Sequence, residues 1–524
     1  AVRHSFDAVV NPKDLRETYL PAFEALVKEA GVESVMGAYN RVNGEPACGS
    51  KTLLRDILRG EWGFEGHVVS DCWALKDFHE AHHVTATAPE SAALAIENGC
   101  DLNCGEVYLQ LLAAYQEGRV TEEQITTAFE RLMTTRYLLG ILGDEGSEYD
   151  AIAYDANDTD ENARFSQTVA EKSMVLLKND GTLPLALAKL QSVGVIGPNA
   201  TSIACLEGNY SGTSSRYVTY LEGIRSACEG KARVFYSQGS HLYKDRTSNL
   251  AMADDRLAEA VAVAERCDVS VLCLGLDATL EGEEGDTGNE YSSGDKRDLR
   301  LPACQQKLLD AVVAVGKPVV VVLSAGSALS VSQGNAILQA WYPGQAGGTA
   351  LARILFGEVS PGGRLPVTFY HGVDDLPAFE DYAMCNRTYR YYEGTPLYPF
   401  GYGLSYTRFA YSDARYENHT VTVTVKNVGA VAADEVVQAY CKDHDSPYAV
   451  RNHALCAVTR VSLAAGEQAT VTLPLSPYAF TAVDDEGKRV SRSKRFTLYI
   501  GGSQPDGRSV ELLGQAPLKL EIQL

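Results

Sequence analysis

The chain has 524 residues, too many for a single hydrophobic core, so we expect two to four domains. Apolar residues make up 45% of it and charged residues 22%, as in soluble globular proteins. The formal net charge of −22 argues against nucleic acid and anionic membranes as partners, and it leaves neutral ligands open. No apolar run approaches the roughly 18 residues that a membrane-spanning helix needs.

The first 142 residues alternate between predicted strands and predicted helices. Apolar residues at helical spacing predict helices over residues 12–31, 50–60, 88–98, 106–117 and 121–140. Short apolar runs predict strands over 32–39, directly before Asp71, and over 99–102. This alternation is typical of a (β/α) barrel, but only about three of the eight strands are present. We therefore interpret residues 1–142 as the C-terminal part of a (β/α) TIM-like barrel.

A second α/β region follows an acidic, pattern-free linker over residues 143–160. Near-continuous valine and leucine runs predict a mostly parallel sheet with helices on both faces, an α/β sandwich over residues 161–370. The strands are expected at 193–196, 234–236, 269–274 and 319–323, with helices at 163–178, 251–266 and 304–315. Gly197-Pro198-Asn199 lacks the spaced glycines of a dinucleotide site, so no nucleotide cofactor is expected.

In the last part of the chain, apolar and polar residues alternate with a period of two. Residues 371–399 are interpreted as a connector. From residue 400 to 524, alternating runs such as Thr420-Val421-Thr422-Val423-Thr424-Val425 are separated by turn residues. Several short strands at this spacing predict a β-sandwich.

The twelve cysteines are scattered, and several lie in apolar segments, such as Cys267 and Cys273. We therefore expect free, buried thiols in a reducing compartment, which slightly favours a cytoplasmic over a secreted protein. The first seven residues carry none of the features of a signal peptide. Cys100 and Cys104 lack the second pair that a zinc site requires, so no metal is expected.

The most informative stretch is Gly63-Phe64-Glu65-Gly66-His67-Val68-Val69-Ser70-Asp71-Cys72-Trp73. It predicts a turn and a short strand that ends in a carboxylate, with an indole nearby. Residues at the C-terminal tips of barrel strands point into the active site. A carboxylate there suits attack on a sugar carbon, and an indole suits stacking on a sugar face.

This stretch resembles the nucleophile segment of glycoside hydrolase family 3, and other segments match the family in order along nearly the whole chain. The matching segments are Arg16-Glu17-Thr18-Tyr19-Leu20-Pro21-Ala22-Phe23, Ser34-Val35-Met36-Gly37-Ala38-Tyr39-Asn40-Arg41-Val42-Asn43-Gly44, Asp101-Leu102-Asn103-Cys104-Gly105, Ile196-Gly197-Pro198-Asn199-Ala200, Trp341-Tyr342-Pro343-Gly344-Gln345, Gly362-Gly363-Arg364-Leu365-Pro366 and Tyr398-Pro399-Phe400-Gly401-Tyr402-Gly403-Leu404-Ser405-Tyr406. The resemblance implies that the final sandwich is a fibronectin type III-like domain. Ser70-Asp71-Cys72 and Leu102-Asn103-Cys104-Gly105 look most similar to the branch that contains many β-xylosidases, beside β-glucosidases.

The resemblance implies a retaining exo-acting β-glycosidase that removes terminal β-linked glucose or xylose through a covalent glycosyl-enzyme, without a cofactor or metal. It assigns the nucleophile to Asp71. The acid/base should lie on the acidic loop after the 269–274 strand, where Glu283 matches the family pattern best. A one-residue slip would favour Glu284, and Glu281 is a third choice.

Four further residues are candidates for substrate binding. Tyr39 is expected near the nucleophile, although it could be a core residue. Trp73 could stack on sugar, but Cys72 stands where much of the family has an aromatic residue. Arg41 could orient Tyr39 or lie on the surface, and Met36 is also consistent with simple packing.

The family's barrel begins well before this sequence does, and the Lys-His-Phe segment that contacts sugar hydroxyls is absent from it. Half a barrel leaves unpaired edges and exposed apolar surface. We therefore expect the first 140 residues to fold poorly alone or to pair with a separate N-terminal half-barrel chain or a second copy. The sequence could be a fragment of a longer gene product or half of a two-chain enzyme. The alternative function is a non-catalytic carbohydrate-binding or scaffold remnant that needs such a half for activity.

Overall fold

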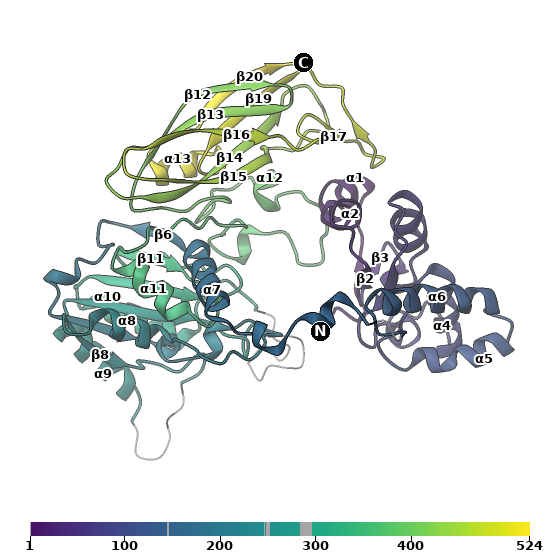
Figure 1. The fold of residues 1–524 in the computed structure, drawn as a ribbon, viewed down its shortest axis with the longest axis horizontal. Coiled ribbons are helices and arrows are strands. Elements are labelled where there is room, and N and C mark those ends of the chain that lie inside the picture. Colours follow the sequence, from purple (N-terminus) through teal and green to yellow (C-terminus); the bar gives the residue numbers. More distant parts are fainter. Residues whose placement is uncertain (1, 144–145, 246, 248–251, 283–295) are drawn as a thin grey trace. The chain divides into compact units, whose positions relative to one another are not determined.

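The computed structural model describes residues 2–143, 146–245, 247, 252–282 and 296–524. Contacts divide the chain into two compact units (Figure 1). The first unit contains Ala1–Ala156, Ala378–Met384 and Ala482–Val490. The second unit contains Asn157–Pro377, Cys385–Thr481 and Ser491–Leu524. No helix in these described ranges has the length and apolar character needed to cross a membrane.

Short parallel strands form the centre of the first unit. Strand β2 (Ser34–Gly37) pairs in parallel with β5 (His67–Ser70), in a register that places Gly37 opposite Ser70. The strand expected at 99–102 is reduced to one parallel bridge between Leu102 and Val69. Since the three segments run in the same direction, their C-terminal ends meet at one edge. A smaller sheet joins β1 (Asp7–Ala8), β3 (Arg41–Val42) and β4 (Glu45–Pro46).

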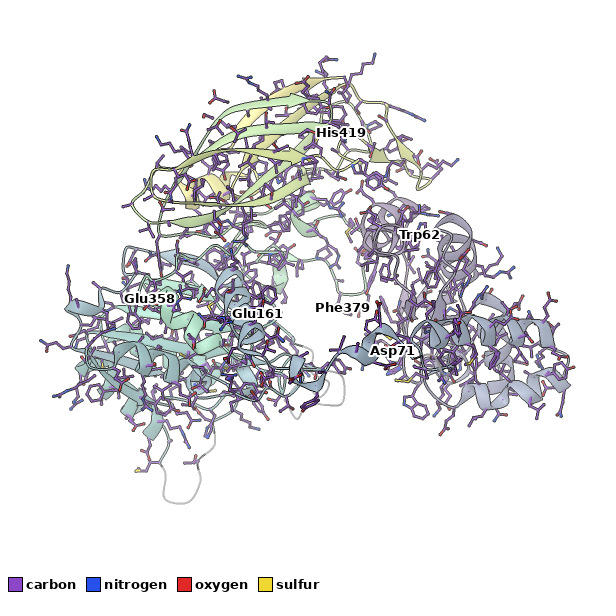
Figure 2. The ribbon with its side chains drawn as sticks, in the orientation of Figure 1. Trp62, Asp71, Glu161, Glu358, Phe379 and His419 are labelled. Carbon is purple, nitrogen blue, oxygen red and sulfur yellow. A yellow bond between two sulfur atoms is a disulfide. The ribbon has the colours of Figure 1, made fainter. Side chains whose placement is uncertain are left out.

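Helices surround these strands, and their ends follow local sequence signals. The Thr87 side chain accepts a hydrogen bond from Glu90 N at the start of α4, and Gly99 ends that helix with φ of +92°. Trp62 follows helix η3 and packs on the apolar core of the unit (Figure 2). The helices are α1 (Pro12–Asp14), η1 (Leu15–Tyr19), α2 (Pro21–Lys28), η2 (Ala47–Gly49), η3 (Lys51–Glu61), α3 (Asp77–Glu80), α4 (Ala88–Asn98), η4 (Val107–Gln110), α5 (Leu111–Gln116), α6 (Glu122–Leu138), η5 (Glu148–Ala151) and η6 (Tyr154–Ala156).

Two segments from late in the sequence complete the first unit. Tyr382 stacks on Tyr19 with ring centroids 5.6 Å apart, and the Tyr19 hydroxyl donates to the Tyr382 carbonyl at 2.8 Å. Met384 N donates to the buried carboxylate of Asp14 at 3.0 Å. The hairpin of β17 (Ala482–Val483) and β18 (Arg489–Val490) also belongs to this unit.

The second unit begins with a six-stranded sheet in the order β6-β11-β10-β9-β7-β8. Only the outer strand β6 is antiparallel, and the other neighbours are parallel as the sequence predicts. Alternate residues of β9 and β10 belong to two separate apolar clusters, so both faces of the sheet are covered. Its strands are β6 (Val175–Asn179), β7 (Ser192–Ile196), β8 (Arg233–Ser237), β9 (Val269–Gly275), β10 (Val319–Ser324) and β11 (Ala336–Gln339), and its longer helices are α7 (Asp160–Ser173), α8 (Tyr220–Cys228), α9 (Asp255–Arg266), α10 (Ala303–Ala314) and α11 (Gly347–Leu355).

A β-sandwich completes the second unit, with sheets in the orders β12-β13-β16 and β15-β14-β19-β20. Val421, Val423 and Val425 of β13 are fully buried, as the period of two predicts. The strands are β12 (Phe409–Glu417), β13 (Thr420–Asn427), β14 (Ala433–Asp443), β15 (Ala454–Leu463), β16 (Gln468–Pro474), β19 (Arg495–Gly501) and β20 (Leu518–Gln523); the short helices α12 (Thr388–Tyr391) and α13 (Gly507–Leu513) accompany them.

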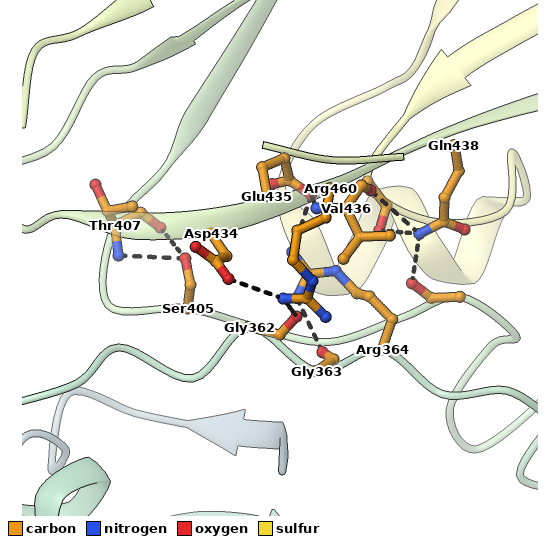
Figure 3. Close-up of polar contacts among 12 residues, drawn as sticks. Gly362, Gly363, Arg364, Ser405, Thr407, Asp434, Glu435, Val436, Gln438 and Arg460 are labelled. Carbon is orange, nitrogen blue, oxygen red and sulfur yellow. Dashed lines mark hydrogen bonds and ion pairs between the residues drawn. The ribbon is translucent and has the colours of Figure 1, made fainter. Parts of the chain in front are cut away.

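Charged residues join the sandwich to the α/β region within the second unit (Figure 3). Arg364 Nη2 lies 2.9 Å from Glu435 Oε1, and both side chains are almost fully buried. Arg460 Nη1 donates to the Gly362 carbonyl at 3.1 Å and to Asp434 at 3.2 Å. A buried ion pair fixes one geometry, because each charge needs its partner once water is excluded.

Candidate active site

Asp71 follows the last residue of β5, at the edge where the three parallel segments end (Figure 2). Its backbone N–H donates to the Gly37 carbonyl at the tip of β2, at 3.0 Å. Its carboxylate oxygen Oδ1 accepts from the Cys72 N–H at 2.7 Å. The side chain is only partly buried, so this carboxylate has a fixed direction and remains open to a ligand.

A disulfide joins Cys72 to Cys104, with the two Cα atoms 4.5 Å apart. The expectation of free thiols is therefore wrong for this pair. The argument that cysteine usage indicates a reducing compartment rested on that expectation and no longer holds. The two residues follow neighbouring parallel segments, which brings them together although they are 32 apart in sequence. The other ten cysteines are free, and all of them except Cys385 are buried.

Ser70 strengthens the same junction through contacts that no local sequence pattern predicts. Its buried hydroxyl oxygen accepts from Asn103 Nδ2 at 3.1 Å and from Cys104 N at 3.0 Å. Trp73 N donates to the Cys104 carbonyl at 2.7 Å. The residues on both sides of Asp71 are thus tied to the segment 103–104.

Tyr39 follows the tip of β2 and lies in a cluster of aromatic and charged groups. Its ring contacts the His4 ring at 4.7 Å between centroids, and the Arg3 guanidinium carbon lies 5.0 Å from its centroid. His4 Nδ1 lies 2.8 Å from Oδ2 of Asp77, the first residue of α3. No local sequence pattern predicts these roles of Arg3, His4 and Asp77, because Arg3 and His4 lie 36 and 35 positions before Tyr39 and Asp77 lies 73 positions after His4.

The other three predicted binding residues differ in their surroundings. Trp73 is 51% exposed and has φ of +68°, and Met36 is 59% exposed. Arg41 Nη2 donates to the Ser5 carbonyl at 3.1 Å, so it fastens the segment that carries His4. Trp73 and Met36 present apolar surface that the described residues do not cover.

The candidate acid/base residues belong to the second unit. Glu283 and Glu284 lie outside the described residues. Glu281 is described: its carboxylate accepts hydrogen bonds from Gly326 N, Ser327 Oγ and Tyr342 OH. Burial, followed by the charge and hydrogen bond of Glu281, raises the pKa of Tyr342. The phenol therefore keeps its proton and donates it in the hydrogen bond to Glu281.

Comparisons with known proteins agree with the motifs. Residues 4–135 match the glycosyl hydrolase family 3 N-terminal domain, residues 174–406 the glycosyl hydrolase family 3 C-terminal domain, and residues 435–504 the fibronectin type III-like domain.

Among curated relatives, a β-xylosidase of Formosa agariphila is 33% identical over 94% of this chain and 70% of its own length. A periplasmic β-glucosidase of Salmonella typhimurium is 32% identical over 92% of this chain and 68% of its own.

Solved structures agree with the same assignment. A β-glucosidase from Erythrobacter marinus superposes with a TM-score of 0.86 at 32% identity, over 100% of this chain and 72% of that one. A family 3 exo-β-xylosidase in complex with a xylobiose aziridine probe gives a TM-score of 0.87 at 28% identity, over 100% of this chain and 70% of that one. These matches confirm the resemblance: the chain belongs to glycoside hydrolase family 3 and is a glycoside hydrolase.

Proposed function

We propose that this enzyme hydrolyses terminal non-reducing β-linked xylose or glucose with retention of configuration. The observation that carries the proposal is the position of Asp71 at the tip of β5, with one oxygen held by Cys72 N. In the first step this carboxylate forms a bond to the anomeric carbon, while an acid protonates the departing glycosidic oxygen. In the second step water takes the sugar, its proton goes to the same acid/base group, and the aspartate is released.

The proton donor in this proposal is Glu283, with Glu284 as the alternative. Both match the acidic pattern of the family, and their glycine-rich surroundings in the sequence allow the backbone conformations that a long loop needs. Glu281 was the third candidate, but its oxygens already accept several hydrogen bonds. Tyr39, Trp73, Arg41 and Met36 are proposed to contact the sugar or to support the residues that do.

Xylose is the preferred candidate for the sugar. A xylan 1,4-β-xylosidase of Xylanibacter ruminicola and the Formosa β-xylosidase are relatives over at least 94% of this chain. β-Glucosidases are also among the relatives, so the assay compares both sugars.

We further propose that residues 1–142 are the C-terminal part of a (β/α) barrel, with 143–160 as the linker, 161–370 as the α/β sandwich domain, 371–399 as the connector and 400–524 as the fibronectin type III-like domain. The parallel order of β2, β5 and Leu102 supports the barrel. This interpretation also supports the second candidate function, a remnant that needs a separate N-terminal half. Apolar side chains exposed on α2 and β2, such as Phe23, Leu26 and Met36, favour that candidate.

The experiment measures hydrolysis of 4-nitrophenyl β-xyloside and β-glucoside by the chain and by Asp71→Ala. We expect Asp71→Ala to lose about 10³-fold or more in kcat, because the variant lacks the carboxylate that forms the glycosyl-enzyme in this proposal. Asp56→Asn, an exposed carboxylate of the same unit, is the matched control and should keep full activity. Equal rates for the chain and Asp71→Ala, or no hydrolysis without an added half-barrel chain, would favour the remnant.

A further inference from the structure

Two charged residues, Glu281 and Lys296, border the acidic segment 283–295 in the sequence, and both are attached to one turn of the second unit. That turn, Gly326-Ser327-Ala328, follows β10 closely. Gly326 N donates to Glu281 Oε2 at 2.7 Å, and the Ser327 hydroxyl donates to Glu281 Oε1. Lys296 Nζ donates to the Ala328 carbonyl at 2.9 Å.

The two side chains also face each other in a mostly buried environment. Lys296 Nζ lies 3.8 Å from Glu281 Oε1, and the side chains are only 15% and 12% exposed. A buried carboxylate needs donors and a buried ammonium needs acceptors or an opposite charge. Each residue is therefore stable here only while it keeps its contacts with the turn and with its partner.

The turn itself is held by the central sheet. Strand β10 is buried along its whole length, and Leu276 N donates to the Ser324 carbonyl at 2.6 Å. Tyr342, which also donates to Glu281, follows Ala340, whose N–H bonds to the Leu323 carbonyl at 2.8 Å. Glu281 and Lys296 thus connect two chain positions 15 residues apart to one rigid edge.

These contacts also bear on which glutamate donates the proton. A general acid needs a free O–H directed at the leaving-group oxygen. The Glu281 oxygens accept from three donors, which occupy three of about four lone-pair sites, and an ammonium lies 3.8 Å from Oε1. This arrangement suits a structural anchor better than a proton donor.

We propose that Glu281 and Lys296, which flank residues 283–295 in the sequence, form a brace that positions the proton donor. Glu281 is then a positioning residue and not the acid/base. This inference rests on the proposed function, which places the donor at Glu283 or Glu284.

The first test measures the brace without any substrate. Amide hydrogen exchange of the peptide over residues 325–329 is compared in the full chain, Glu281→Ala and Lys296→Met. We expect the Gly326 amide to exchange at least 10-fold faster in Glu281→Ala, because it loses its acceptor. Glu358→Ala, an exposed carboxylate of the same unit, should leave this exchange unchanged. Tyr342→Phe removes a single donor and serves as the milder variant if Glu281→Ala does not fold.

The second test separates positioning from proton donation. Removing the acid/base of a retaining glycosidase abolishes the basic limb of the pH profile and lets azide attack the glycosyl-enzyme, which gives a glycosyl azide. We expect Glu283→Gln or Glu284→Gln to show both effects. Glu281→Ala and Lys296→Met should lower kcat/KM about 10-fold or more, keep the basic limb and give no glycosyl azide. Glu281→Gln, which retains an acceptor oxygen, should recover part of the loss.

Two results would overturn the proposal. Unchanged exchange at Gly326 in both Glu281→Ala and Lys296→Met would show that there is no brace. A glycosyl azide from Glu281→Gln would show that Glu281 is itself the acid/base. If the unmodified chain hydrolysed no glycoside, the proposed function would fail on that result alone, while the exchange measurement would still decide whether the brace exists.

Discussion

Ser70 takes no chemical part in the proposed reaction, yet it directly precedes Asp71 and its hydroxyl accepts hydrogen bonds from Asn103 and Cys104. In Ser70→Ala the partly buried Cys104 N–H loses its acceptor, which costs about 1 kcal/mol in the free energy of unfolding. We expect kcat to fall about 10-fold or more, because small displacements of a reacting group are costly. Denaturant unfolding and 4-nitrophenyl xyloside kinetics measure both effects. Ser70→Thr, which keeps the hydroxyl, is the control, and wild-type kcat in Ser70→Ala would contradict the role of this contact.

His453 makes the β-sandwich sensitive to acid. Burial, with a smaller contribution from the nearby Lys442 charge, lowers the pKa of His453 from 6.5 to about 4. Below pH 6.5 the His453 side chain binds a proton in the unfolded chain but stays neutral in the folded chain. The free energy of unfolding therefore falls as the pH falls from 6.5 towards 4. The loss amounts to about 3 kcal/mol for this one side chain.

The measurement is urea unfolding at pH 7 and pH 4.5, followed by signals from the second unit. His453→Phe keeps a ring against Tyr389 and Tyr440 but cannot titrate. We expect the variant to lose less stability between the two pH values than the unmodified chain. Identical losses would show that His453 does not titrate in this interval.

The disulfide acts on the loop that carries Asp71. It closes a loop with a sequence separation of 32, which in the chain-entropy model stabilises the fold by about 3–4 kcal/mol. We expect Cys72→Ser/Cys104→Ser to lower the unfolding temperature of the first unit and leave the second unchanged, because both cysteines belong to the first. Calorimetry measures this, with Cys385→Ser, the exposed free cysteine, as the control. An unchanged first transition would contradict the stabilising role.

Helices and buried strands were largely predictable because their signals are local. The helix expected over 121–140 forms over Glu122–Leu138, where Thr121 and Gln124 make a capping box. Strands β6 and β11 were missed: each is short and apolar, and each is recognisable only from its partner in the sheet. The same difference between local and long-range contacts decides which residues of the candidate site could be predicted. The position of Asp71 at a strand tip could be predicted, whereas the contacts of Ser70 and His4 and the disulfide join distant segments.

Arg364 and Glu435 couple the α/β region of the second unit to its sandwich. Replacing Arg364 by Met leaves the buried Glu435 charge without its main partner, a change that costs about 3–5 kcal/mol. We expect Arg364→Met to separate the unfolding of the sandwich from that of the α/β region, while the unmodified unit unfolds in one transition. Calorimetry with Arg451→Met, an exposed arginine of the sandwich, is the matched comparison. One shared transition in Arg364→Met at the original temperature would show that this pair does not couple the two parts.

In the proposed mechanism, activity depends on a covalent bond between the sugar and the protein. Incubation with 2-deoxy-2-fluoro-β-xylosyl fluoride slows both steps but slows release more, so the glycosyl-enzyme accumulates. Digestion and mass spectrometry then locate the added sugar. We expect a single label on the peptide that contains Asp71, and none in Asp71→Ala. A label on another carboxylate, or turnover of substrate with no labelled peptide, would contradict the assignment of the nucleophile.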